Sequence, residues 1–219
     1  MSFEPAWLDL RAPADAAARN NDLLLKAASF VARTSSPRIV DLGAGTGATV
    51  RAMEAHLPED ARWRLVDGDA GLLDVAVARH GDRIEPWLSD LGNLDAGYLD
   101  GADLVTASAL FDLMPERWVD ALVARLARSG AALYAALSYD GFLHWEPADP
   151  RDEAVRTAFN AHQRSDKGLG PALGPDAARH LAGALELRGY TVSVAASPWR
   201  LGAGMEELQA ELVSGIEAA

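Results

Sequence analysis

An acid and three glycines are concentrated in residues 39–49, IVDLGAGTGAT. Asp41 follows an apolar run, and glycines occupy the alternate positions 43, 45 and 47. Such a run is typical of a strand that ends in a turn, where glycines allow positive φ and bring the backbone close to a ligand before a helix begins. The stretch therefore predicts a ligand-binding loop. The competing interpretation is a tight turn that holds no ligand.

The glycine spacing fits two kinds of ligand. Residues 43–48 satisfy G-x-G-x-x-G/A, the fingerprint of dinucleotide-binding proteins. An adenosyl ligand and a dinucleotide both call for an acid after the second strand, where it accepts hydrogen bonds from ribose hydroxyls. Asp67 lies twenty residues beyond Gly47 and suits either ligand.

Three motifs together resemble one family. D-x-G-x-G-x-G at 41–47, VDGDAGLLDVA at 66–76 and S-D-L at 89–91 resemble the class I S-adenosylmethionine-dependent methyltransferases. The resemblance covers roughly residues 36–138 and only the element order of 174–197. It has no specific motif in 1–35 or 139–173. It implies a doubly wound, mostly parallel α/β sheet of the Rossmann-like methyltransferase type, with S-adenosylmethionine as cofactor.

The resemblance also implies roles for individual residues. The glycine loop would hold the methionine end, Asp67 the ribose and Asp90 the adenine amino group. An acid beside the loop suits a cofactor with a sulfonium and an ammonium better than one with an anionic pyrophosphate. Asp67 as a strand end and Asp90 as a turn residue are the alternatives. The implied cofactor-binding residues are Asp41, Gly43, Ala44, Gly45, Gly47, Asp67, Gly68, Asp90, Leu91, Ser108 and Ala109.

The segment after the fourth predicted strand departs from the family pattern. Many small-molecule members resemble N-A-L-H-H-L there, whereas residues 108–113 read SALFDL, so that Phe111 and Asp112 replace the histidines. Asp112 is a candidate for orienting an acceptor hydroxyl or amine. The alternative is that it caps a helix beginning near Pro115.

Further candidates for the acceptor side lie in two segments outside the core. Trp7, Arg11, Asp15 and Arg19 are spaced by four, which places them along one face of a helix. A packing aromatic followed by a charge ladder is the competing interpretation. Residues 162–175, HQRSDKGLGPALGP, combine a histidine and two cations with several glycines and prolines. The candidates are Asp112, Tyr139, His144 and His162 for catalysis, and Trp7, Arg11, Arg164 and Lys167 for substrate binding.

Short β-rich runs alternate with longer helical patterns, which is typical of βαβ units around a parallel sheet. We predict one domain with a helical arm (1–35), a cofactor-binding core (36–138), an insertion with a helix near 151–163 (139–173), and a C-terminal helix-strand-helix (174–219). The family's usual last strand beside strand five has no clear counterpart, and we expect the last helix to cover that edge. The predicted strands are 38–43, 63–67, 83–88, 102–108, 131–138 and 190–197.

Composition excludes several classes of protein. The formal net charge of -12, with only two lysines, argues against a nucleic-acid partner. No cysteine is present, no run of about 18 apolar residues suggests a membrane span, and the start does not resemble a secretory signal. We expect a cytoplasmic monomer or homodimer without membrane association. No His, Asp and Glu set has metal-ligand spacing, so we expect no metal.

The resemblance implies methyl transfer from S-adenosylmethionine to a small molecule, with oxygen, nitrogen or carbon left open as the acceptor atom. An NAD(P)-dependent oxidoreductase is the second interpretation, although the sequence has no Tyr-x-x-x-Lys pair for hydride transfer. A non-catalytic cofactor-binding or partner subunit is the third. Its motivation is the replaced histidines and the missing last strand.

Overall fold

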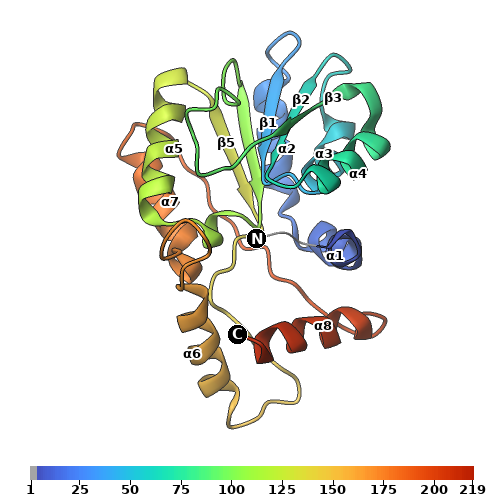
Figure 1. Ribbon diagram of the computed structural model, residues 1–219, viewed down its shortest axis with the longest axis vertical. Coiled ribbons are helices and arrows are strands. Elements are labelled where there is room, and N and C mark those ends of the chain that lie inside the picture. The colour runs from blue at the N-terminus through green and yellow to red at the C-terminus, as the bar shows by residue number, and fades with distance from the viewer. Residues whose placement is uncertain (1–3) are drawn as a thin grey trace.

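A five-stranded parallel sheet forms the centre of the computed structural model, which describes residues 4–219 (Figure 1). The strand order β3-β2-β1-β4-β5 places β1 in the middle, with β2 and β4 paired to its two sides. The predicted α/β class is confirmed, as are the first five predicted strands. The strands are β1 (Arg38–Leu42), β2 (Arg62–Asp67), β3 (Ile84–Leu88), β4 (Leu104–Ser108) and β5 (Ala132–Ala136).

Helices lie between most of the strands, before β1 and after β5. The predicted insertion helix is confirmed as α6. None of the helices in residues 4–219 combines the length and apolar character needed to cross a bilayer. The α-helices are α1 (Pro5–Ala18), α2 (Asn21–Val31), α3 (Ala48–Met53), α4 (Ala70–His80), α5 (Glu116–Ser129), α6 (Asp152–Gln163), α7 (Ala177–Glu186) and α8 (Glu206–Glu217). Short 3-10 turns are η1 (Glu54–His56), η2 (Gly81–Arg83), η3 (Phe111–Leu113) and η4 (Gly174–Asp176).

Hydrophobic cores lie on both faces of the sheet. On one face Ile39 packs with residues of α2, α3 and α4. On the other face Val40 and Leu42 pack with α5, α7 and the connection 91–102. The side chains of Ile39, Val40 and Leu42 are fully buried. A strand covered on both sides needs apolar residues at nearly every position, which explains the continuous run around Asp41.

Helix α5 shows how the sequence pattern sets the packing. Its buried residues recur at helical spacing and face the sheet, while the opposite side of the helix carries charge. The helix ends at Gly130, which adopts φ 76° and accommodates the left-handed conformation of a C-cap. The buried residues are Trp118, Val119, Leu122, Val123 and Leu126.

The N-terminal arm consists of two helices that meet at Asn20. The Asn20 side chain accepts a hydrogen bond from the Leu23 N–H (3.0 Å) and so begins α2. The predicted helical arm is therefore divided into two helices by a cap. An ion pair between Asp9 and Arg79 (2.8 Å) fixes α1 to α4, and the Leu8 side chain lies against Gly45.

The predicted strand at 190–197 is wrong, because these residues form no regular structure. A strand needs a neighbouring backbone, and these residues find only isolated partners. The Tyr190 hydroxyl donates to the Ala131 carbonyl (2.8 Å) and Lys26 donates to the Ser193 hydroxyl (2.7 Å). Alternating hydrophobicity was present, but no last strand exists for the segment to pair with. The predicted C-terminal helix-strand-helix is thus two helices joined by an extended segment.

Helix α8 does not cover the free edge of β5, so that expectation is also wrong. It contacts α1 instead, and both helices lie beyond the ends of the strand arrows (Figure 1). The Trp199 indole N–H donates to Asp15 (2.9 Å). The Arg11 guanidinium lies 5.0 Å from the Trp199 ring centroid and pairs with Asp15. The Arg11–Asp15 charge ladder therefore exists, and it joins the arm to the C-terminal segment.

We predict that Trp199→Phe frees this segment while leaving the sheet intact. The phenyl ring still stacks on Arg11, but the lost hydrogen bond to the Asp15 carboxylate removes about 1.5–3 kcal/mol of stabilisation. Amide hydrogen exchange should accelerate in 198–205 and in α1, and stay unchanged in β1 and β4. Trp145→Phe in the insertion is the control. Unchanged exchange in both segments would contradict the assigned contact.

Candidate functional site

The carboxyl ends of β1, β2 and β4 bring the predicted site residues to one edge of the sheet. The glycine loop follows β1 there and leads into α3. A Cβ on Gly47 would lie 2.7 Å from the His80 Nε2, and Gly47 has a φ of 82°. A Cβ on Gly45 would lie 3.1 Å from the Leu8 side chain. The loop is therefore compatible only with glycine at these two positions.

The His80 side chain packs against Gly47 of the glycine loop. It is buried, and its Nε2 has no hydrogen-bond partner. Burial lowers the pKa of His80 below its ordinary value, so the imidazole is neutral at physiological pH. A neutral ring packed against Gly47 has a structural role.

Asp41 is a buried carboxyl at the end of β1. It is 1% exposed and accepts a hydrogen bond from the Thr106 hydroxyl on β4 (2.6 Å). Burial raises the pKa of Asp41 to about 6, while the hydrogen bond from Thr106 and the positive charge of Arg19 oppose that rise. The group is thus mostly ionised at neutral pH and places negative charge beneath the glycine loop.

Asp67 joins the end of β2 to the glycine loop. One carboxylate oxygen accepts from the Gly45 N–H (2.8 Å), and the other accepts from the Asp69 N–H (3.0 Å). A carboxylate has further lone pairs, so both contacts leave capacity for ligand hydroxyls. Asp69 accepts from the N–H groups of Gly71 and Leu72 and so caps the start of α4.

Ser108 lies at the end of β4 within a polar network that sequence reasoning only partly found. The Arg19 guanidinium donates to its hydroxyl (2.8 Å), and the Thr49 hydroxyl lies 3.1 Å from the same oxygen. The spacing by four along the arm singled out Arg19 but did not connect it to the glycine loop. Thr49 and Thr106 gave no sequence signal, because their partners are on distant strands and helices.

The predicted adenine-side residues lie in a turn after β3. The Asp90 carboxylate accepts from the Gly92 N–H (2.8 Å) and is exposed, which matches the turn interpretation for one of its oxygens. The Trp118 indole donates to the Leu91 carbonyl (2.6 Å) and fixes this segment on α5. Gly68 is exposed beside Asp67, and Ala109 adopts a positive φ of 50° next to Ser108.

Asp112 is a buried carboxyl in η3, which follows β4. One of its oxygens, Oδ1, is enclosed without a hydrogen-bond partner. Burial raises the pKa of Asp112 from 3.8 to about 6, and the backbone N–H groups of Asp112 and Tyr139 and the charge of Arg11 lower it in part. The helix-cap alternative is wrong, because no side chain caps the start of α5 at Pro115.

The insertion is tied to the end of β5 through Tyr139. Its hydroxyl donates to the Asn160 side chain on α6 (2.7 Å), and its ring meets Phe159 edge-on with centroids 5.5 Å apart. Burial raises the pKa of Tyr139 to about 12, so the phenol stays protonated. His162, also on α6, has a buried Nδ1 without a hydrogen-bond partner.

Other predicted acceptor residues have separate surroundings. His144 is exposed and lies 3.6 Å from Glu146. Arg164 forms an ion pair with Asp176 (2.9 Å) and thereby joins the insertion to α7. Trp7 and Lys167 are half-buried. The structure brings none of these four into contact with Asp112 through a hydrogen bond or ion pair among residues 4–219.

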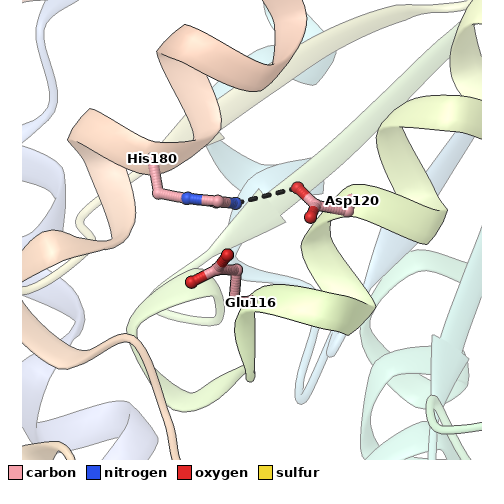
Figure 2. A group of neighbouring side chains, drawn as sticks. All are labelled: Glu116, Asp120 and His180. Atoms are coloured by element: carbon pink, nitrogen blue, oxygen red, sulfur yellow. Dashed lines mark hydrogen bonds and ion pairs between the residues drawn. The ribbon is translucent and has the colours of Figure 1, made fainter.

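A second polar cluster lies between α5 and α7. Figure 2 shows Glu116, Asp120 and His180 directed toward one another, with the His180 Nε2 2.8 Å from the Asp120 carboxylate. Their ligand-type atoms all lie within 4.8 Å of one another, the one such group among the described residues. An open cavity of about 460 Å³ adjoins Asp120 and His180. Both carboxylates are exposed, and the hydrogen bond joins two packed helices.

Comparison of whole structures shows the fold. An O-methyltransferase family protein from Burkholderia thailandensis has a TM-score of 0.56 at 18% identity over 86% of this chain and 53% of its own. A SAM-dependent methyltransferase from Aquifex aeolicus has a TM-score of 0.55 at 15% identity over 90% and 94%. The mitomycin 7-O-methyltransferase MmcR has a TM-score of 0.51 at 17% identity over 86% and 51%.

The chain thus has the Rossmann-like fold of methyltransferase structures and spans about half the length of the first and third. No protein-family profile and no curated protein sequence matches it. The identities are too low to transfer a substrate, so the site residues carry the functional argument.

We predict that the His180–Asp120 contact is an interhelix hydrogen bond. Asp120→Ala and His180→Ala should each lower the free energy of unfolding by about 0.5–1.5 kcal/mol in urea titrations. The double variant should cost no more than either single change, because both remove the same contact. Glu186→Ala, an exposed change on α7, is the control. A melting temperature that rises with Zn²⁺ in the wild type but not in His180→Ala would instead identify a metal site.

Proposed function

We propose that this protein transfers a methyl group from S-adenosylmethionine to a small-molecule acceptor. The observation that carries the proposal is the acid-led glycine loop, in which Asp67 holds the Gly45 N–H and Asp41 lies buried at the end of β1. Two carboxylates at one loop favour a ligand with positive charge and oppose an anionic pyrophosphate. S-adenosylmethionine carries a sulfonium and an ammonium.

The residues at this edge fit the cofactor. Thr46 has a buried hydroxyl without a hydrogen-bond partner in the glycine loop, which leaves it available to a ligand. The remaining lone pairs of Asp67 would accept hydrogen bonds from the ribose hydroxyls. Asp90 and Leu91, in the turn beyond β3, would hold the adenine.

When bound, S-adenosylmethionine would supply an electrophilic methyl group to the acceptor and leave as S-adenosylhomocysteine. Positioning of the acceptor behind that methyl accounts for much of such catalysis. We assign the remaining step to Asp112, whose Oδ1 would take the proton from an O–H or N–H acceptor. Its raised pKa of about 6 leaves it ionised, and therefore able to accept a proton, at neutral pH.

The acceptor would enter from the side of the arm and the insertion. Arg11 lies near enough to lower the pKa of Asp112, so it can bind an acidic acceptor or its anion. Tyr139 and His162 would line the same side through α6. Trp7 and Lys167 stay predicted substrate-binding residues. Arg164 would position the insertion through its ion pair with Asp176.

The net charge of the chain and one structural neighbour favour a small-molecule acceptor. The net charge of -12 opposes a nucleic-acid substrate. MmcR is described as a mitomycin 7-O-methyltransferase, which supports a small organic acceptor here as well. We infer a cytoplasmic enzyme that acts as a monomer or homodimer.

The other two functions are less well supported. If the protein were an NAD(P)-dependent oxidoreductase, the anionic pyrophosphate of its cofactor would lie beside two carboxylates, and the like charges would repel. Burying a carboxyl oxygen without a hydrogen-bond partner is energetically costly, as for Asp112 Oδ1. A non-catalytic cofactor-binding subunit offers no function for this carboxyl.

We predict that calorimetry will detect S-adenosylhomocysteine binding to the wild type and no binding of NADH. Asp67→Ala should weaken S-adenosylhomocysteine binding by at least about 10-fold, because it removes the ribose acceptor and loosens Gly45. Asp74→Ala, an exposed change on α4, should bind normally. Binding of NADH without the adenosyl ligand would overturn the methyltransferase proposal.

We predict a pH dependence that Asp112 controls. Release of S-adenosylhomocysteine should be followed with a panel of phenols, alcohols, amines and carboxylic acids as acceptors. For a phenol or alcohol, kcat/KM should fall as the pH drops below about 6, because Asp112 becomes protonated. Asp112→Asn should lower kcat by about 100- to 10,000-fold.

A matched variant and a stability measurement complete this experiment. Asp140→Asn, an exposed change beside Tyr139, should keep the wild-type rate. Asp112→Asn should melt at the same or a higher temperature at pH 7.5, since it removes an ionised group from a buried site. An unchanged rate in Asp112→Asn would exclude Asp112 as the base.

A further inference from the structure

We propose that Arg19 binds the carboxylate at the amino-acid end of the cofactor and makes the site selective for adenosyl ligands that carry it. This inference rests on the proposed function and names one residue of that site. It assigns the arm a direct part in ligand recognition, in addition to covering the glycine loop.

Arg19 follows the last residue of α1 in the break before α2, and its side chain reaches the end of β4. It is 9% exposed. Its Nη2 donates to the Ser108 hydroxyl (2.8 Å) at the end of β4. Its Nη1 is buried and has no hydrogen-bond partner. One half of the guanidinium is therefore fixed in place, and the other half is available to an acceptor.

A buried guanidinium with an unpaired N–H group destabilises the protein unless an anion accepts a hydrogen bond from it. Guanidinium has five N–H donors and no acceptor, and a donor enclosed without a partner destabilises the fold. Asp41 is near enough to feel the charge of Arg19, but its hydrogen bond comes from Thr106. No ion pair joins Arg19 to a carboxylate of residues 4–219. The missing partner is therefore an anion that the protein itself does not provide.

The surrounding charges indicate which anion fits. Arg19 donates to the Ser108 hydroxyl, the Thr49 hydroxyl lies 3.1 Å from that oxygen, and the charge of Arg19 acts on the Asp41 carboxyl. A cation and an anion at one site match the carboxylate and the ammonium of an α-amino acid. Planar guanidinium binds a carboxylate through paired hydrogen bonds, so recognition at Nη1 discriminates against ligands that lack the group.

The test compares two ligands that differ only in this carboxylate. S-adenosylhomocysteine has it, and decarboxylated S-adenosylhomocysteine keeps the adenosine, the thioether and the ammonium. By calorimetry the wild type should prefer S-adenosylhomocysteine by about 10- to 100-fold. Arg19→Met should abolish this preference by weakening only the carboxylate-bearing ligand. Arg19→Lys should retain part of it.

Arg33→Met is the matched control, because Arg33 follows α2 on the same arm and stacks over Phe30 at the surface. It should keep the wild-type preference. If the wild type bound neither ligand, the proposed function itself would fail. If the wild type bound both ligands equally, or if Arg19→Met weakened both by the same factor, Arg19 would have only a structural role and the inference would be overturned. Should Arg19→Met not fold, the wild-type preference and its reduction in Arg19→Lys decide the question.

Discussion

The parallel pairing of β1 with β2 and β4 is the constraint on which the rest of the structure depends. Because all three strands run in the same direction, their carboxyl ends meet at one edge. That edge collects Asp41, Asp67 and Ser108 from segments far apart in the sequence. Burial of β1 on both faces fixes its register, since a shift by one residue would exchange the side chains of the two cores. The position of the site follows from the packing of the sheet.

The edge is also where the protein keeps polar groups that a stable core would exclude. Asp41 and Asp112 are buried carboxyls whose pKa values rise to about 6, and Arg19 and Thr46 have buried donors without partners. Each is individually unfavourable, since desolvation of a charge or a hydroxyl is not fully compensated. Their concentration at the end of the central strands is typical of a site that a ligand completes.

Two terminal segments cover this edge together. The arm contributes Leu8 over Gly45 and Arg19 beside Ser108, and the C-terminal segment is fixed to the arm through Trp199 and Asp15. The chain therefore uses α8 to hold the arm, and β5 remains an edge strand with only isolated contacts to 190–194. The arm is therefore held at this edge by an ion pair to α4, a hydrogen bond to Ser108 and the contact with Trp199.

The sequence by itself determined the sheet and most of the residues that lie at its carboxyl edge. Its apolar runs predicted five strands correctly, and the glycine loop with Asp67 indicated where a ligand would bind, because strand ends and turns depend on local residue types. Tertiary structure alone decided the rest. The run at 190–197 has a strand's alternation but forms no strand, because it makes no backbone ladder with the free edge of β5. Likewise, only folding placed Arg19 beside Ser108 and enclosed Asp112, since both depend on contacts between residues that are distant in the sequence.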